Sequence, residues 1–201
     1  MRRLPRLQRY TLWGCPLLGC VWLAACAAPP LTLYTLDTPM MPTHPPPLGK
    51  TPIVVAVARV TVPDELDTED IVVRDGSTLQ RSRLGRWSSR LSLAITGRLT
   101  GRLAERYPRT LVTDRPLTDA PSDRILVNVG RLDLTTGGMA TLNADWLVVP
   151  RDQAAPARRE RIHITATGPV ATDQDVVTLL GGVLDKLAAA IEIPGLAVKK
   201  P

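Results

Sequence analysis

The sequence contains no phenylalanine, and aromatic residues make up only 3% of its 201 residues. Beyond residue 26 the aromatic side chains are Trp87, Trp146, Tyr34 and Tyr107. Proteins that bind single-stranded nucleic acid stack successive bases on aromatic side chains. The scarcity of such side chains indicates that nucleic acid is not a partner of this chain.

Cysteine is also scarce, and its three copies, Cys15, Cys20 and Cys26, all lie near the start of the chain. Every residue after Cys26 therefore lacks a thiol, which excludes disulfides and thiolate metal sites from the later part. We expect that part to be stabilised by packing alone and to carry neither a metal nor a cofactor.

Acidic residues are absent before Asp37, whereas Arg2, Arg3, Arg6 and Arg9 precede an uncharged, largely apolar stretch. A basic start, an apolar run and then small residues are typical of a secretory signal peptide. We expect residues 1–25 to be that signal. Its removal takes four arginines and no acid, so the formal charge of +6 falls to +2, with 21 basic and 19 acidic residues. The basic balance is therefore mostly a property of the precursor.

The apolar run ends in Leu23-Ala24-Ala25-Cys26, which resembles a bacterial lipobox. In a lipobox the cysteine receives a diacylglycerol thioether before cleavage and an acyl chain on its amino group afterwards. Each buried CH₂ contributes about 0.8 kcal/mol, and two or more chains hold a protein stably on a bilayer. The resemblance implies lipidation of Cys26. The alternatives are a transmembrane helix over residues 12–28, which would be short and contain Pro16, and an ordinary signal peptide.

Prolines crowd the segment that follows Cys26. They favour extended conformations, so residues 26–52 are expected to form a semi-rigid spacer that holds the domain away from the bilayer. Within it, residues 31–36 alternate between apolar and polar side chains, which predicts an edge strand. We expect one domain over residues 53–193 and a C-terminal tail over 194–201.

Hydrophobic periodicity predicts the elements of that domain. Strands are expected at 53–62, 71–73, 110–113, 124–135, 139–149 and 161–167, and helices at 83–106 and 173–191. Gly137-Gly138 predicts a hairpin turn, Gly130 a bulge, and Thr172 or Asp173 the cap of the second helix. Trp87 and Trp146 are expected in the core. The pattern indicates an α+β fold with a mainly antiparallel sheet and two long amphipathic helices packed on one face.

No motif of a known catalytic site is present. The sequence lacks a Gly-x-Ser-x-Gly elbow, a phosphate-binding loop and a His-Glu-x-x-His zinc motif. His44 in the spacer and His163 on a strand are expected to be exposed, and the acidic residues 64–70 are expected to form a solvated loop. We therefore expect no enzymatic activity.

The first predicted helix contains the candidate contact residues. Gly97 and Gly101 lie on one face, and two glycines in a helix indicate either close approach of another backbone, such as a second subunit, or tight packing within the domain. The basic residues are either a solvated face or a docking surface for acidic lipid heads or a partner: Arg86, Arg90, Arg98, Arg102 and Arg106.

Several short segments, in this order and spacing, are similar to the ABC-type transport auxiliary lipoproteins, also called PqiC-like or YmbA-like. They are the lipobox, Leu33-Tyr34-Thr35-Leu36, Val60-Thr61-Val62-Pro63, Leu66-Asp67, Ile71-Val72-Val73-Arg74, Arg86-Trp87 with Leu91, the late hairpin with Trp146, and the C-terminal helix. The basic residues Arg83 and Arg86 before Trp87 depart from the acidic or mixed pattern expected there.

The resemblance implies an outer-membrane lipoprotein that works beside an MCE-domain protein and an ABC permease and ATPase. Such systems move lipids between the two membranes of Gram-negative bacteria, and the lipoprotein docks or anchors the conduit. Ala27 stands where aspartate would resemble an inner-membrane retention signal, so the periplasmic face of the outer membrane is the expected location. The alternative is a periplasmic ligand-binding or envelope-structural lipoprotein without a transporter.

Overall fold

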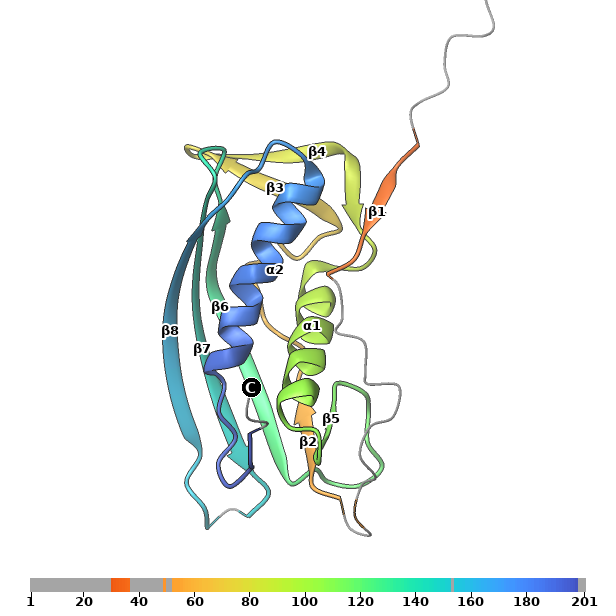
Figure 1. Cartoon of the computed structure of the whole chain (residues 1–201), viewed down its shortest axis with the longest axis vertical. Coiled ribbons are helices and arrows are strands. Elements are labelled where there is room, and N and C mark those ends of the chain that lie inside the picture. The colour runs from red at the N-terminus through yellow and green to blue at the C-terminus, as the bar shows by residue number, and fades with distance from the viewer. Residues whose placement is uncertain (1–29, 37–48, 50–51, 153, 199–201) are drawn as a thin grey trace, which may run out of the picture. The chain divides into compact units, whose positions relative to one another are not determined.

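Two mixed β-sheets and two helices form the fold of this chain (Figure 1). The computed structural model describes residues 30–36, 49, 52–152 and 154–198. In chain order the elements are β1 (Thr32–Tyr34), β2 (Val54–Val57), β3 (Asp70–Asp75), β4 (Thr78–Trp87), α1 (Leu91–Arg106), β5 (Leu111–Thr113), β6 (Asp123–Leu134), β7 (Met139–Pro150), β8 (Arg158–Thr167) and α2 (Asp173–Ala190).

The larger sheet has the strand order β5-β2-β6-β7-β8, and the smaller one has the order β1-β4-β3. β2 is parallel to both β5 and β6, and β1 is parallel to β4, whereas the remaining pairs are antiparallel. The α+β class is confirmed, but the expectation of a mainly antiparallel sheet is wrong. Each parallel pair joins strands that are distant in sequence, and local patterns reveal only the hairpins.

The hairpin of β6 and β7 is the longest pairing in the fold. Its register shifts between Val129 and Arg131, so Gly130 forms the expected bulge. On β7 one face is buried against the helices through Leu142, Ala144, Trp146 and Val148. The helices cover this face of the larger sheet (Figure 1), where α2 packs on β7 and β8 and α1 packs on α2 and β5.

α2 begins at the expected position with a reciprocal cap. The Asp175 amide donates to the Thr172 hydroxyl at 3.2 Å, and the Thr172 amide donates to the Asp175 carboxylate at 3.0 Å. This capping box satisfies two amides that the first turn would otherwise leave unpaired. The buried stripe of α2 then follows at helical spacing through Val176, Leu180, Val183, Leu184 and Leu187.

The predicted start of the first helix is wrong. Residues 83–87 form the end of β4, and α1 begins only at Leu91. Trp87 is buried in the core as expected, but from a strand, while Leu84 is exposed. β4 pairs here with β1 on one side and with β3 on the other, and these backbone hydrogen bonds outweigh the local helical spacing.

β1 confirms the edge strand expected within residues 31–36, because it pairs only with β4 in the smaller sheet. The strand expected at 53–62 is shorter, since β2 ends at Val57. The chain returns to β6 at Thr61, which bridges to Asn128. The Val60 amide donates to the Thr96 hydroxyl on α1 at 2.9 Å, which ties this break to the helix.

Candidate functional site

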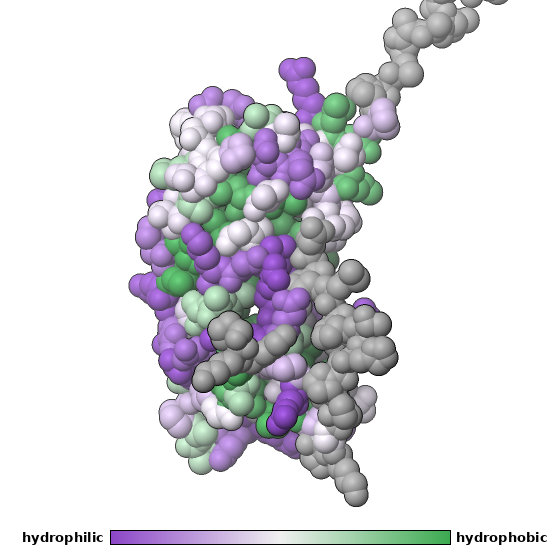
Figure 2. All heavy atoms as spheres, in the orientation of Figure 1, coloured by the Kyte–Doolittle hydropathy of each residue, from purple (hydrophilic) through white to green (hydrophobic). Residues whose placement is uncertain are grey.

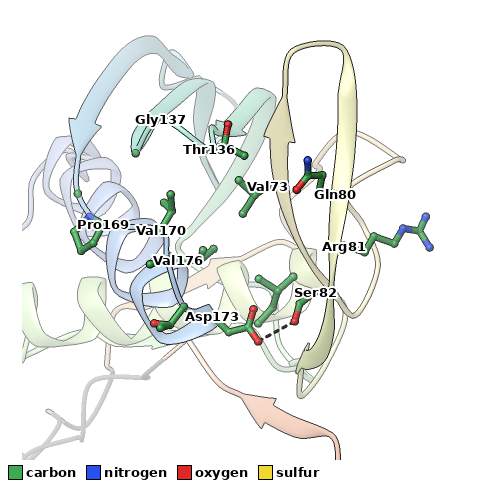
Figure 3. A pocket seen from close by; sticks show the side chains of 15 residues that line it. Val73, Gln80, Arg81, Ser82, Thr136, Gly137, Pro169, Val170, Asp173 and Val176 are labelled. Atoms are coloured by element: carbon green, nitrogen blue, oxygen red, sulfur yellow. Dashed lines mark hydrogen bonds between the residues drawn. The ribbon is translucent and has the colours of Figure 1, made fainter.

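A cavity of about 490 Å³ opens between β3, β4, the β6–β7 turn and the start of α2 (Figure 3). Its apolar lining comes from Ile71, Val73, Val170 and Val176. Its polar lining comes from Gln80, Arg81, Ser82, Thr136 and Asp173. The cavity therefore combines an apolar interior surface with hydrogen-bonding groups, which is the usual composition of a ligand or peptide pocket.

One side of this cavity is held by a contact between β4 and α2. The Ser82 hydroxyl donates to the Asp173 carboxylate at 2.8 Å (Figure 3) and accepts from the Gly85 amide at 2.9 Å. A Cβ on Gly85 would lie 2.2 Å from the Asp173 carboxylate oxygen, so a side chain at this position is incompatible with the contact. Among the described lining residues there is no histidine, cysteine or lysine that would pair a base with a nucleophile.

The two helices are joined by a cluster of charges around Asp185 on α2. Arg98 and Arg102 on α1 each donate two hydrogen bonds to its carboxylate, at 2.8 to 2.9 Å. Burial raises the pKa of Asp185, but the hydrogen bonds from Arg102 and Arg98 outweigh it and leave the pKa below its usual value. One turn further, Arg106 donates to the Ile191 carbonyl at 3.2 Å, beyond the end of α2.

These contacts correct the interpretation of the basic residues on α1. Arg98 is buried, and Arg98, Arg102 and Arg106 face α2 instead of forming a solvated or docking surface. The sequence analysis missed Asp185. The available signal was a single acidic residue beside the apolar stripe of one helix, together with arginines four residues apart on the other.

Arg86 and Arg90 differ in their surroundings. Arg86 binds Asp70 across β3 and β4, with its Nε 3.0 Å from the carboxylate. Arg90, just before α1, is exposed, and its guanidinium lies 3.9 Å from Asp67. Burial raises the pKa of Asp67, but hydrogen bonds from Ser92 and the charges of Arg59 and Arg90 hold the pKa below its usual value. Of the acidic residues 64–70, Asp67 and Asp70 are therefore paired with neighbouring arginines.

Gly97 and Gly101 on α1 have different surroundings from Gly181 on α2. A Cβ on Gly97 would meet no heavy atom within 4 Å, and Gly101 is half-buried. On α2, a Cβ on Gly181 would lie 3.0 Å from the Arg98 guanidinium. The close helix contact that glycine permits within the fold is therefore at Gly181, which the sequence analysis did not single out.

The proposed lipidation site lies outside the described residues. Cys26, the expected signal peptide over 1–25 and His44 are all among the residues that are not described, and so are residues 12–28, on which the two alternatives to lipidation depend. His163 is exposed on β8 as expected. Neither α1 nor α2 has the length and apolar character needed to cross a bilayer. Within the described ranges, acidic, histidine and cysteine side chains nowhere gather in a group of three that would hold a metal ion.

The sequence model of the ABC-type transport auxiliary lipoprotein component family matches residues 34–192, from the end of β1 to just beyond α2. The chain belongs to this family. Its members are described as lipoprotein components auxiliary to ABC-type transport, which is not a known class of enzyme. No curated protein matches the chain.

Two solved structures resemble this fold. A crystal structure of an uncharacterized protein has a TM-score of 0.63 and 19% identity, and the match covers 80% of this chain and 95% of that chain. A crystal structure of a protein from Xanthomonas campestris has a TM-score of 0.58 and 13% identity, with 78% and 90% covered. At these identities the likeness establishes the fold alone.

Proposed function

We propose that this auxiliary lipoprotein is a docking or structural component of an ABC/MCE-type lipid transport system, anchored to the periplasmic face of the outer membrane. The observation that carries the proposal is the family match over residues 34–192. The lipobox ending in Cys26 supports the proposed lipid anchor, and Ala27 after it supports delivery to the outer membrane. In this role the protein positions partners and catalyses no reaction.

The partner surface is proposed to include residues that do not hold the domain together. Arg90 is exposed and bound to Asp67 only at 3.9 Å. A Cβ on Gly97 would meet nothing within 4 Å, so another subunit can approach α1 there, and Gly101 lies one turn further along the same helix. Arg86 is a weaker candidate, because its guanidinium is already engaged with Asp70 and with two backbone carbonyls.

A second candidate function is ligand binding without a transporter. The cavity of about 490 Å³ beside α2 favours it, because the pocket joins an apolar surface to fixed hydrogen-bonding groups. Extraction of the native protein followed by lipid mass spectrometry separates the two functions. A stoichiometric bound lipid would support the ligand-binding role.

The docking role is tested by crosslinking in intact envelopes followed by capture of the lipoprotein. We expect an MCE-domain protein to be captured together with it. Arg90→Glu should lower that yield several-fold by reversing the charge of the contact, whereas Arg109→Glu, at an exposed site just beyond α1, should not. Capture of abundant lipoproteins alone, with no MCE-domain protein, would contradict the proposed role.

A further inference from the structure

Three leucines are exposed together where β1 pairs with β4. Leu33 is 66% exposed, Leu31 58% and Leu84 42%. In the parallel register Leu33 lies opposite Arg86, and Leu31 and Leu84 are the residues that immediately precede the first pair, Thr32 and Gly85. Alternate residues of a strand point to opposite faces, which places these leucines on the outer face and Trp87 on the core side. Figure 2 shows apolar side chains gathered where β1 joins the domain.

Two arginines lie beside this leucine patch, which consists of Leu31, Leu33 and Leu84: Arg83 precedes Leu84 in the chain, and Arg86 lies opposite Leu33 in the strand register. Arg83 is exposed and has no ion-pair partner among the described residues. Arg81 and Arg86 share a single carboxylate, that of Asp70, at 2.9 and 3.0 Å. The Asp70 side chain is much less exposed than that of Arg81, so this group of two arginines and one carboxylate presents positive charge to the solvent.

The patch lies very close in sequence to the proposed anchor. Only residues 27–30 separate Cys26 from Leu31. A fully extended chain spans at most about 3.6 Å per residue, so the Cα of Thr32, where β1 begins, lies within roughly 22 Å of the Cα of Cys26. Because β1 is part of the smaller sheet, the expected spacer of residues 26–52 is interrupted after its first six residues. The tether therefore keeps this face of the domain beside the bilayer.

We propose that the leucine patch is a membrane-contact surface. It enters the interface of the leaflet that carries the Cys26 lipid, and Arg83 with its neighbouring arginines contacts anionic phospholipid headgroups. The proposal rests on the lipid anchor of the proposed function. It orients the domain with the β1–β4 face of the smaller sheet toward the membrane and with the larger sheet and the helices toward the periplasm.

A bilayer fits this surface better than a protein does. A stable protein interface buries roughly 800 Å² on each partner, whereas three leucine side chains supply only a fraction of that area. A tether makes a weak contact effective because it holds the two surfaces at a high local concentration. Apolar side chains flanked by arginine are also the composition that binds the interface of anionic membranes.

The test uses the acylated protein reconstituted into vesicles of phosphatidylethanolamine and phosphatidylglycerol. Leu33→Cys introduces a thiol for a polarity-sensitive fluorophore, since the chain has no cysteine after Cys26. The matched control is Leu126→Cys on β6, at a leucine that is 41% exposed in the other sheet. We expect spin-labelled lipids to quench the fluorophore at position 33 several-fold more than the one at position 126.

Charge is tested separately with Arg83→Glu, which should reduce quenching at position 33 on anionic vesicles but not on vesicles of phosphatidylcholine. Equal, weak quenching at positions 33 and 126 of a protein with acylated mass would overturn the membrane contact and leave the anchor intact. Shielding of position 33 that depends on protein concentration and not on lipid would assign the patch to a second copy. A protein without acyl mass would overturn both the contact and the anchor.

Discussion

Gly138 closes the turn between β6 and β7 with a φ of 78°. This is the left-handed region, which costs a residue with a Cβ about 1–2 kcal/mol. Its carbonyl accepts from the Gly168 amide at 2.9 Å, and a Cβ on Gly138 would lie 2.5 Å from the Gly168 carbonyl oxygen. The neighbouring Gly137 has no such restriction, because its nearest contact would be the Thr135 hydroxyl at 3.8 Å.

Gly138→Ala should therefore lower the free energy of unfolding by roughly 2–3 kcal/mol, from backbone strain and the clash with Gly168. Gly137→Ala is the matched control and should change it by less than about 0.5 kcal/mol. Equilibrium urea denaturation of the purified protein measures both. Equal stability of the two variants would show that the turn adjusts without strain.

At the scale of the elements, α1 and α2 are held together by charge as well as by apolar packing. Asp185 accepts hydrogen bonds from two arginines that lie one helical turn apart on α1. The pKa of Asp185 is below its usual value in the folded protein, so its carboxylate stabilises the fold at pH values above the unfolded pKa. This contribution is lost as the pH falls through the folded pKa.

Asp185→Asn should lower the free energy of unfolding by about 2 kcal/mol at pH 7, because charged hydrogen bonds to Arg98 and Arg102 are weakened. The difference between wild type and variant should shrink as the pH falls below about 4, where Asp185 in the unfolded chain becomes protonated, and should vanish once the pH has passed below the lowered pKa of Asp185 in the folded protein. Urea denaturation of both proteins between pH 7 and pH values below about 4 measures this difference in the free energy of unfolding. Asp119→Asn, at an exposed loop position, is the control. A difference that is constant with pH would contradict the ion-pair account.

At the scale of the whole molecule, the proposed location of the protein depends on one residue, Cys26. The fold has no other proposed means of membrane anchoring in its described residues, since neither helix is long and apolar enough to span a bilayer. The proposed membrane contact of the leucine patch would add to the lipid anchor but is too small to replace it. Delivery to the outer membrane should therefore be controlled by the chemistry of Cys26.

Cys26→Ser removes the sulfur that would be acylated. We expect an uncleaved, unacylated precursor that remains at the inner membrane, because lipobox cleavage follows acylation. Intact-mass analysis and detergent phase partitioning of membrane fractions test this, with Cys20→Ser as the control within the signal peptide. Unchanged mass and outer-membrane fractionation of the Cys26→Ser variant would contradict the lipobox interpretation.

Sequence patterns predicted the elements whose partners are near in the chain. The β6–β7 hairpin, the bulge at Gly130 and the cap of α2 at Thr172 depend on neighbouring residues, and all three are confirmed. The residues 83–87 show the limit of such patterns. Their spacing is helical, but pairing with β1 and β3 makes them a strand.

By itself, the amino-acid sequence determined the α+β class, the hairpin, the second helix and the likeness to a lipoprotein family, because contiguous residues carry those signals. Only the tertiary structure decided that the sheets are mixed, that Asp185 joins the helices, and that leucines are exposed where β1 pairs with β4. These features join residues that are distant in sequence, and their energies depend on burial and pairing that no local pattern contains.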